Sequence, residues 1–168
     1  MNVFEFAREI ETSGERFYNE MAGRARADGV RHIFDMLAED ESRMLMDLQK
    51  LEERYGAIMR DSLALDAGRN VFADLRRRED QLLVTSDVEA YRLAMMAERQ
   101  VVDQYRAAIE RESDPEVRGM LRQIVSMEER ELDELERLCD FVDAPNRFLE
   151  WGEFSNLDEF HNFGRYES

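Results

Sequence analysis

Apolar residues recur at spacings of three and four along four long stretches of the sequence. This spacing matches the 3.6-residue turn of an α-helix, so the pattern predicts helices over residues 2–27, 30–55, 87–112 and 115–142. The connection 56–86 is long for a structureless loop in a compact domain. We expect its VFADLRRRE run to form a short helix, and the whole connection to cross from one end of a helical bundle to the other.

Polar residues with strong capping preferences mark the expected helix starts. Ser86 followed by Glu89 gives the Ser-x-x-Glu pattern of a capping box. Asp114 followed by Pro115 places a capping carboxylate before a proline at the first helical position. Asp28 is the expected cap of the second helix, so three of the four starts have a sequence signal of their own.

The C-terminal segment differs in kind from the rest of the chain. Pro145 predicts the end of the fourth helix, and aromatic residues are dense in residues 145–168. Such density does not fit a disordered tail. We therefore expect a bundle over residues 1–144, with repeated halves at about 4–55 and 87–142, and a tail with a short helix that packs on the bundle or on a second subunit.

The strongest pattern is an internal repeat without gaps, in which residues 31–51 return as residues 118–138. In each copy, one glutamate, Glu41 or Glu128, stands inside an otherwise apolar helix face. A charge at a core position needs a partner or a metal. The matching pairs at the offset of 87 residues are Arg31 and Arg118, Phe34 and Leu121, Leu37 and Ile124, Leu48 and Leu135, and Leu51 and Leu138.

The repeat extends upstream with the same offset. Glu11 and Tyr18 match Glu98 and Tyr105, so each half reads as a helical hairpin that contributes one glutamate from each of its helices. Two hairpins packed face to face would bring four carboxylates towards one centre. The matching residues are Ala7 and Ala94, Glu11 and Glu98, Tyr18 and Tyr105, and Glu41 and Glu128.

Composition narrows the classes of partner. The chain of 168 residues has a net charge of −16, which argues against binding to nucleic acid and to anionic membrane surfaces. Its single cysteine, Cys139, allows no intrachain disulfide and no paired-cysteine metal site. The N-terminus lacks the pattern of a signal peptide, and no apolar run is long enough to span a membrane, so we expect a cytoplasmic protein.

On these motifs, an Ala-x3-Glu-x6-Tyr helix followed by a Leu/Ile-x3-Glu helix in each half, the chain resembles the rubrerythrin-like proteins of the ferritin-like superfamily over residues 4–141. The resemblance implies an all-α ferritin-like four-helix bundle holding two iron ions. It implies that Glu11 and Glu98 each bind a metal and that Glu41 and Glu128 bridge the two. Tyr18 and Tyr105 match tyrosines whose hydroxyls hold the ligand carboxylates in place.

The sequence departs from the family pattern at both histidine positions, three residues after the bridging glutamates. These positions hold Met44 and Glu131. Val101 stands where the family has an additional glutamate, and the four-cysteine rubredoxin module is absent from these residues. Neither His32 nor His161 has the spacing of the missing ligands.

The remaining donors favour hard ions. Carboxylates suit iron, manganese or magnesium, so we expect two divalent ions, iron first, with zinc or manganese as alternatives. Glu131 is either an oxygen ligand in place of histidine or an exposed helix residue. Met44, a poor ligand for such ions, is interpreted as core packing beside the site. His161 is a candidate ligand if the tail folds back, against the alternative of ordinary tail packing.

Two functions remain open on the sequence alone. The first is a metal-binding oxidoreductase that reduces peroxide or oxidises Fe(II) at a carboxylate-bridged centre, with a separate protein as electron donor. The second is a bundle that has lost catalysis with both histidines and serves in metal buffering or as a structural or interaction module. By resemblance we also expect a homodimer.

Overall fold

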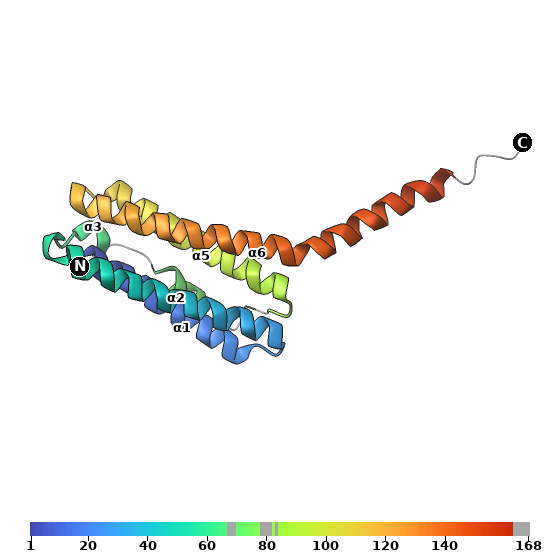
Figure 1. The fold of residues 1–168 in the computed structure, drawn as a ribbon, viewed down its shortest axis with the longest axis horizontal. Coiled ribbons are helices and arrows are strands. Elements are labelled where there is room, and N and C mark those ends of the chain that lie inside the picture. The colour runs from blue at the N-terminus through green and yellow to red at the C-terminus, as the bar shows by residue number, and fades with distance from the viewer. Residues whose placement is uncertain (67–69, 78–81, 83, 163–168) are drawn as a thin grey trace, which may run out of the picture.

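The computed structural model describes residues 1–66, 70–77, 82 and 84–162, with side chains up to residue 144. All regular structure in the described residues is helical, and four long helices form a bundle (Figure 1). The all-α, ferritin-like bundle predicted from the sequence is therefore confirmed. The long helices are α1 (Val3–Arg24), α2 (Asp28–Tyr55), α5 (Asp87–Arg111) and α6 (Pro115–Asn162).

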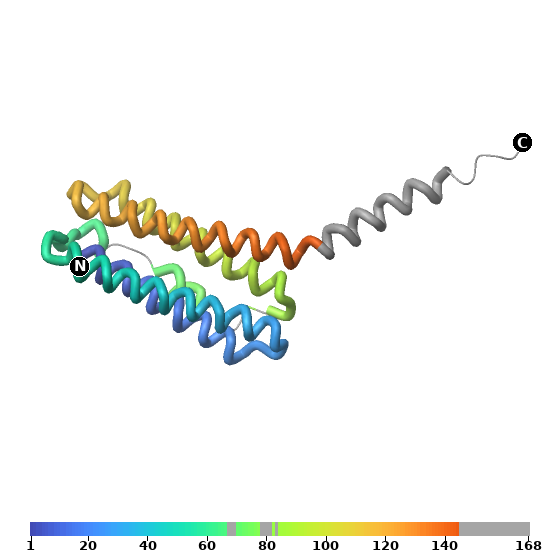
Figure 2. The backbone as a smooth tube through the Cα atoms, in the orientation of Figure 1, coloured from blue at the N-terminus to red at the C-terminus, as the bar shows by residue number. Residues whose placement is uncertain are grey.

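The bundle consists of two antiparallel hairpins, α1 with α2 and α5 with α6. Helices α2 and α5 run in the same direction, so the connection between them passes along the bundle from one end to the other (Figure 2). The predicted crossover is therefore present, and its VFADLRRRE run forms a short helix at its start. The crossover contains η1 (Gly56–Ile58), α3 (Leu63–Asp66) and α4 (Val71–Arg76).

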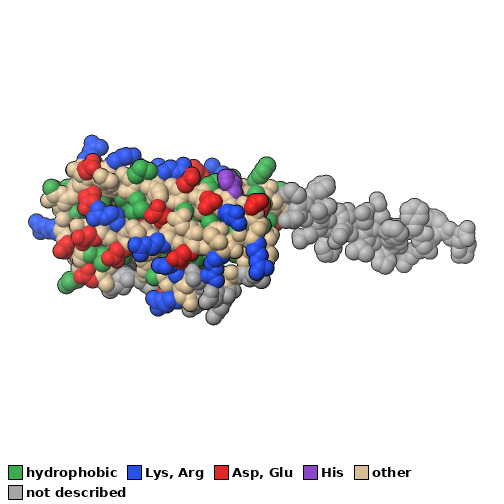
Figure 3. All heavy atoms as spheres, turned by 90° about the horizontal axis from the view of Figure 1, so that it is seen from below, with side chains coloured by type: hydrophobic (Ala, Val, Ile, Leu, Met, Phe, Trp, Pro, Cys, Tyr) green, Lys and Arg blue, Asp and Glu red, His purple; other side chains and the backbone are tan. Residues whose placement is uncertain are grey.

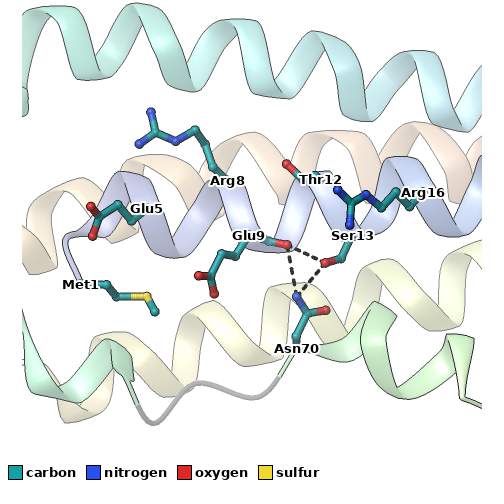
Figure 4. A pocket seen from close by; sticks show the side chains of 8 residues that line it. All are labelled: Met1, Glu5, Arg8, Glu9, Thr12, Ser13, Arg16 and Asn70. Atoms are coloured by element: carbon teal, nitrogen blue, oxygen red, sulfur yellow. Dashed lines mark hydrogen bonds between the residues drawn. The ribbon is translucent and has the colours of Figure 1, made fainter.

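Asn70 fastens the crossover to α1. Its side-chain Nδ2 donates to the carbonyl oxygen of Glu9 at 3.1 Å and to Oγ of Ser13 at 2.9 Å (Figure 4). Its Oδ1 accepts from the backbone N–H of Ala73 at 3.0 Å, which caps α4. One amide group thus starts α4 and holds it against the outer surface of α1.

The predicted caps were accurate at two helix starts and off by one residue at a third, and α1 has a capping box that was not predicted. Ser86 accepts from the backbone N–H of Glu89, and Asp114 accepts from the first N–H groups of α6, as predicted. Asn2 and Glu5 form a capping box on α1. The prediction for α2 was wrong, because the cap residue is Ala27 without a side-chain hydrogen bond and Asp28 is the first helical residue.

The predicted end of the fourth helix near residue 142 was also wrong, because α6 continues to Asn162. A proline removes one backbone donor but leaves the turns on either side free to form, so Pro145 alone does not terminate the helix. The expectation that the aromatic side chains of residues 145–168 pack on the bundle or on a partner lies outside the described side chains.

The repeated apolar stripe forms the core, apart from its last position. Phe34 and Leu121 are fully buried, and the pairs that follow them are buried as well. Leu51 is only half-buried and Leu138 is 40% exposed, so the stripe leaves the core near the end of each copy. Outside the core, acidic and basic side chains are interspersed over the face shown in Figure 3. Among the described residues, no helix has both the length and the apolar composition needed to cross a membrane.

Candidate metal centre

One glutamate from each long helix points into the middle of the bundle. Glu11 of α1, Glu41 of α2 and Glu128 of α6 have exposed fractions of 2%, 5% and 2%, and Glu98 of α5 is half-buried. Each lies on the same face as the apolar residues one turn away, so the helix packing that buries those residues carries the carboxylates inward. The structure therefore brings the four sequence-predicted glutamates to one region.

Glu11 is the acceptor at the centre of this group. The Tyr105 hydroxyl donates to its Oε1 at 2.8 Å, and both side chains are buried. Burial raises the pKa of Glu11, and the side chains of Glu41 and Glu128, which lie beside Glu11, lower that pKa. The acidic groups of Glu11, Glu41 and Glu128 thus lie close together in the core.

The two tyrosines make reciprocal contacts between the halves. Tyr105 of α5 reaches Glu11 of α1, and Tyr18 of α1 donates to Oε1 of Glu98 on α5. The sequence repeat is thus also a repeat of contacts, in which each hairpin supplies the hydroxyl that orients a glutamate of the other hairpin. Such hydrogen bonds fix the direction of a carboxylate.

Burial raises the pKa of every acidic group in the centre, and neighbouring carboxylates raise it further at all of them except Glu11. Desolvation is the main cause at Glu41 and Glu128, whose pKa values lie well above the usual range, and the neighbouring carboxylates add to it. Burial raises the pKa of Glu98 to about 8, partly offset by the Tyr18 hydrogen bond. Burial and the charges of Glu11, Glu98 and Asp40 raise the pKa of Glu131 to about 8 as well.

A cleft of about 540 Å³ connects this centre with solvent. Glu41, Glu98 and Glu131 line it, together with Asp40 and Arg43. Glu131 is partly buried and lines the same cleft as Glu98, so it is not an exposed helix residue, and its role as a ligand stays a prediction. Small solutes and ions have a route to three of the five carboxylates.

The crossover covers the neighbourhood of Tyr18 with an aromatic wall. Phe72 of α4 is fully buried, with its ring 5.6 Å from that of Tyr18 and 5.8 Å from that of Phe17. Phe34 stacks on Tyr18 from α2 at 6.2 Å. Aromatic rings from α1, α2 and α4 therefore pack around Tyr18.

A family model of rubrerythrin matches residues 2–139. The chain belongs to the rubrerythrin family. No curated protein and no solved structure matches the chain at a significant level.

The rubrerythrin family binds pairs of iron ions in general, and the donors present here fit that chemistry in part. The fit rests on Glu128, whose Oε1 is buried and has no hydrogen-bond partner, a costly state for a carboxyl oxygen unless a cation or proton donor takes it up. Among the described residues, no three acidic, histidine or cysteine side chains are already arranged as the ligand set of one ion. Metal binding therefore requires carboxylate side chains to turn, as the flexible glutamate side chain allows.

The residues that depart from the rubrerythrin pattern lie as follows. Met44 is 2% exposed and belongs to the core cluster, in agreement with its interpretation as packing beside the site. His32 is exposed on α2, and Cys139 is buried on α6. The side chain of His161 lies outside the described residues, so its candidacy as a ligand stays a prediction.

Sequence reasoning missed three residues that shape the centre. Asp40 and Arg43 were not singled out from the sequence, although each lies within two residues of Glu41 and lines the cleft. Phe72 was assigned to a short helix without a role, because nothing in the crossover repeats.

Proposed function

We propose that the five glutamates bind two divalent metal ions, iron in the first place, and that the protein is an oxidoreductase that reduces peroxide or oxidises Fe(II). The observation that carries this proposal is the buried Oε1 of Glu128, which lacks a partner in a core that already holds three other acidic groups. Buried carboxylates that repel one another cost stability unless protons or cations offset their charge. A function that uses cations gives a reason to keep them.

In this proposal the glutamates bind the ions and the tyrosines orient the glutamates. Glu11 and Glu98 would each hold one ion, Glu41 and Glu128 would be shared, and Glu131 would supply an oxygen in place of histidine. The tyrosine hydroxyls orient Glu11 and Glu98, so two of the ligands are held in fixed directions. Bound iron would supply the electrons for peroxide reduction, and the cleft admits a substrate of that size.

The two ion positions would differ in strength. On the α5–α6 side, Glu131 lies beside Glu98 in the cleft and adds a donor. On the α1–α2 side, the corresponding position is Met44, whose thioether is a poor ligand for a hard divalent ion and is packed in the core. We therefore propose that the ion near α5 and α6 binds more tightly than the ion near α1 and α2.

Redox turnover would need electrons from outside these residues. The 168 residues hold one cysteine, so they cannot form a four-cysteine iron site that would deliver electrons within the chain. We propose a separate electron-donor protein, a homodimer as the working assembly, and the cytoplasm as the compartment.

Two observations favour a second function. Met44 is fully integrated into the apolar core, and no ready ligand set exists among the described residues. A bundle that no longer turns over, and that buffers metal or serves as a structural module, would tolerate both features. The two functions differ in whether the centre binds iron stoichiometrically and whether bound iron consumes peroxide.

The test is the iron content per chain after anaerobic reconstitution with excess Fe(II) and desalting. About two irons would support the paired centre, and one would support only the site near Glu98 and Glu131. The control is E110Q, which changes an exposed glutamate of α5 and should leave the iron content unchanged. Absence of iron in the wild type would reject the iron centre. Peroxide consumption by the loaded protein with a chemical reductant then separates catalysis from buffering.

A further inference from the structure

Gly14 lies in α1, one turn beyond Glu11, and its helix surface faces the carboxyl group of Glu41. A Cβ atom added at Gly14 would lie 2.7 Å from Cδ of Glu41 and 2.9 Å from Cε2 of Phe72. Real Cβ atoms essentially never approach other heavy atoms so closely. The space that a side chain would take at this position is therefore filled by the Glu41 carboxylate and the edge of the Phe72 ring.

The backbone gives no other reason for glycine here. Gly14 is inside a regular helix, and no glycine of the described residues has a positive φ angle. Glycine is less favourable than alanine within a helix. Gly23, in the same helix, has nothing within 4 Å of its added Cβ, so the close approach is particular to Gly14 and not general to α1.

The second half of the chain lacks this space. At the repeat offset of 87 residues, Gly14 corresponds to Val101 and Glu41 corresponds to Glu128. Val101 is fully buried and carries a branched side chain. The position on α1 that has no side chain beside Glu41 therefore corresponds to a position with a branched side chain in the second half, and the two halves of the centre are not equivalent.

We propose that Gly14 is a positioning residue for the metal centre. Because Gly14 has no side chain, the Glu41 carboxylate can pack against α1 in the metal-free protein and turn towards the ions when they bind. This inference rests on the proposed metal-binding function. In the second half, the Val101 side chain occupies the equivalent position, so Glu128 cannot pack there. Glu41 is therefore the carboxylate that moves on metal binding, and Glu128 is the one that keeps its position. Because the Glu41 contact is with the far end of a flexible side chain, an added methyl group displaces that carboxylate, and the Phe72 ring must shift as well.

The test compares G14A with the matched control G23A, each a glycine-to-alanine change within α1. Fe(II) affinity is measured anaerobically by competition with a chelator. We expect G23A to bind as the wild type does, and G14A to lose about tenfold or more in affinity for at least one ion. The double variant G14A/E41D shortens the displaced side chain by one methylene and should recover part of that affinity. Equal affinity of G14A and G23A would overturn the proposal.

Two further measurements separate positioning from plain packing and from failure of the metal site. G14A/F72L relieves the contact with the phenylalanine ring, so it should restore thermal stability without restoring affinity. It also takes the place of G14A if that variant does not fold. Recovery of affinity in G14A/F72L would mean that the ring, and not Glu41, carried the effect.

If the wild type binds no Fe(II), the proposed function fails while the positioning remains testable without metal. In crystal structures of the metal-free proteins, Glu41 Cδ must move by about 0.7 Å in G14A, from 2.7 Å to the 3.4 Å at which ordinary contacts begin. An unmoved Glu41 carboxylate would overturn the proposal whether or not the protein binds metal.

Discussion

The hydroxyl of Tyr105 donates to Oε1 of Glu11 at 2.8 Å, and this contact links the two hairpins inside the core. Its repeat counterpart links Tyr18 with Glu98 in the opposite direction. Because both hydrogen bonds cross between hairpins, separating the halves would leave buried carboxylates without donors. The same contacts that orient the candidate ligands therefore also hold the bundle together.

Replacing Tyr105 with phenylalanine should destabilise the protein by about 1–3 kcal/mol, because Glu11 loses a buried donor to its charged form. The pKa of Glu11 should rise further, since the Tyr105 hydrogen bond lowers it in the wild type. Urea unfolding gives the stability change, and Y91F is the control, because Tyr91 is a mostly buried tyrosine of the same helix outside the centre. Equal effects of Y105F and Y91F would show that the Tyr105 hydroxyl has no special contribution.

Much of the centre could be predicted because the repeat is a physical signal. Glu41 and Glu128 interrupt an apolar stripe at the same place in both halves, and a charge within a buried face is rare unless the structure uses it. Tyr18 and Tyr105 followed from the same alignment of the halves. The bundle itself followed from the 3.6-residue period, which depends only on which residues are apolar.

The features that the sequence did not predict depend on contacts between distant segments. Phe72 faces Tyr18 from the crossover, which has no repeat partner and no long periodic pattern. Gly14 read as one more position on the face of α1, and only the placement of Glu41 gives it a function. Pro145 predicts a helix end by local preference, but a long helix tolerates a single proline, so α6 continues beyond it.

The metal-free protein should lose stability as the pH rises from 5 to 8. Glu98 and Glu131 have folded-state pKa values of about 8 and a reference value of 4.5, so each stays protonated in the folded state while the unfolded chain releases its proton. A raised folded pKa contributes stability that is fully present below the unfolded pKa and is lost as the pH rises to the folded pKa. Each group should add at most about 1.4 kcal/mol of loss per pH unit.

Denaturant unfolding in the presence of a chelator, at several pH values, measures this slope. E98Q and E131Q should each make it shallower, whereas E110Q should leave it unchanged. A metal-free stability that is independent of pH between 5 and 8 in the wild type would contradict the raised pKa values.

Restoring an imidazole at position 44 should strengthen binding of late transition metals. M44H places a nitrogen donor three residues after Glu41, and nitrogen ligands favour zinc and iron over magnesium. In the metal-free state the same change should cost about 1–3 kcal/mol, because a polar ring replaces a thioether that is 2% exposed. Zn(II) affinity by chelator competition and thermal unfolding give the two numbers.

The control for this change is M44L, which preserves volume and apolarity and should cost less than about 1.5 kcal/mol in stability. If Met44 only packs, M44L binds metal as the wild type does. A marked loss of affinity in M44L would instead make the thioether a ligand and would contradict its interpretation as core packing.

Glu128 offers the sharpest separation of stability from function. Its carboxyl group is buried, its Oε1 has no partner, and burial together with the charges of Glu11 and Glu98 raises its pKa. At neutral pH its protonation therefore opposes folding, since the unfolded chain would prefer the ionised form. E128Q keeps the shape and removes the ionisation, so the metal-free protein should become more stable by about 1–3 kcal/mol at pH 7. The same variant should lose Fe(II) binding, because a neutral amide is a poor substitute for a shared carboxylate.

Two measurements on this variant test both effects: chemical unfolding in the presence of a chelator, and iron content after reconstitution. A stabilised variant that no longer binds iron would show that this glutamate is kept for its ligand chemistry at a cost to the fold. A destabilised variant would mean that Glu128 is a structural group, and the case for the metal centre would lose the observation on which it rests.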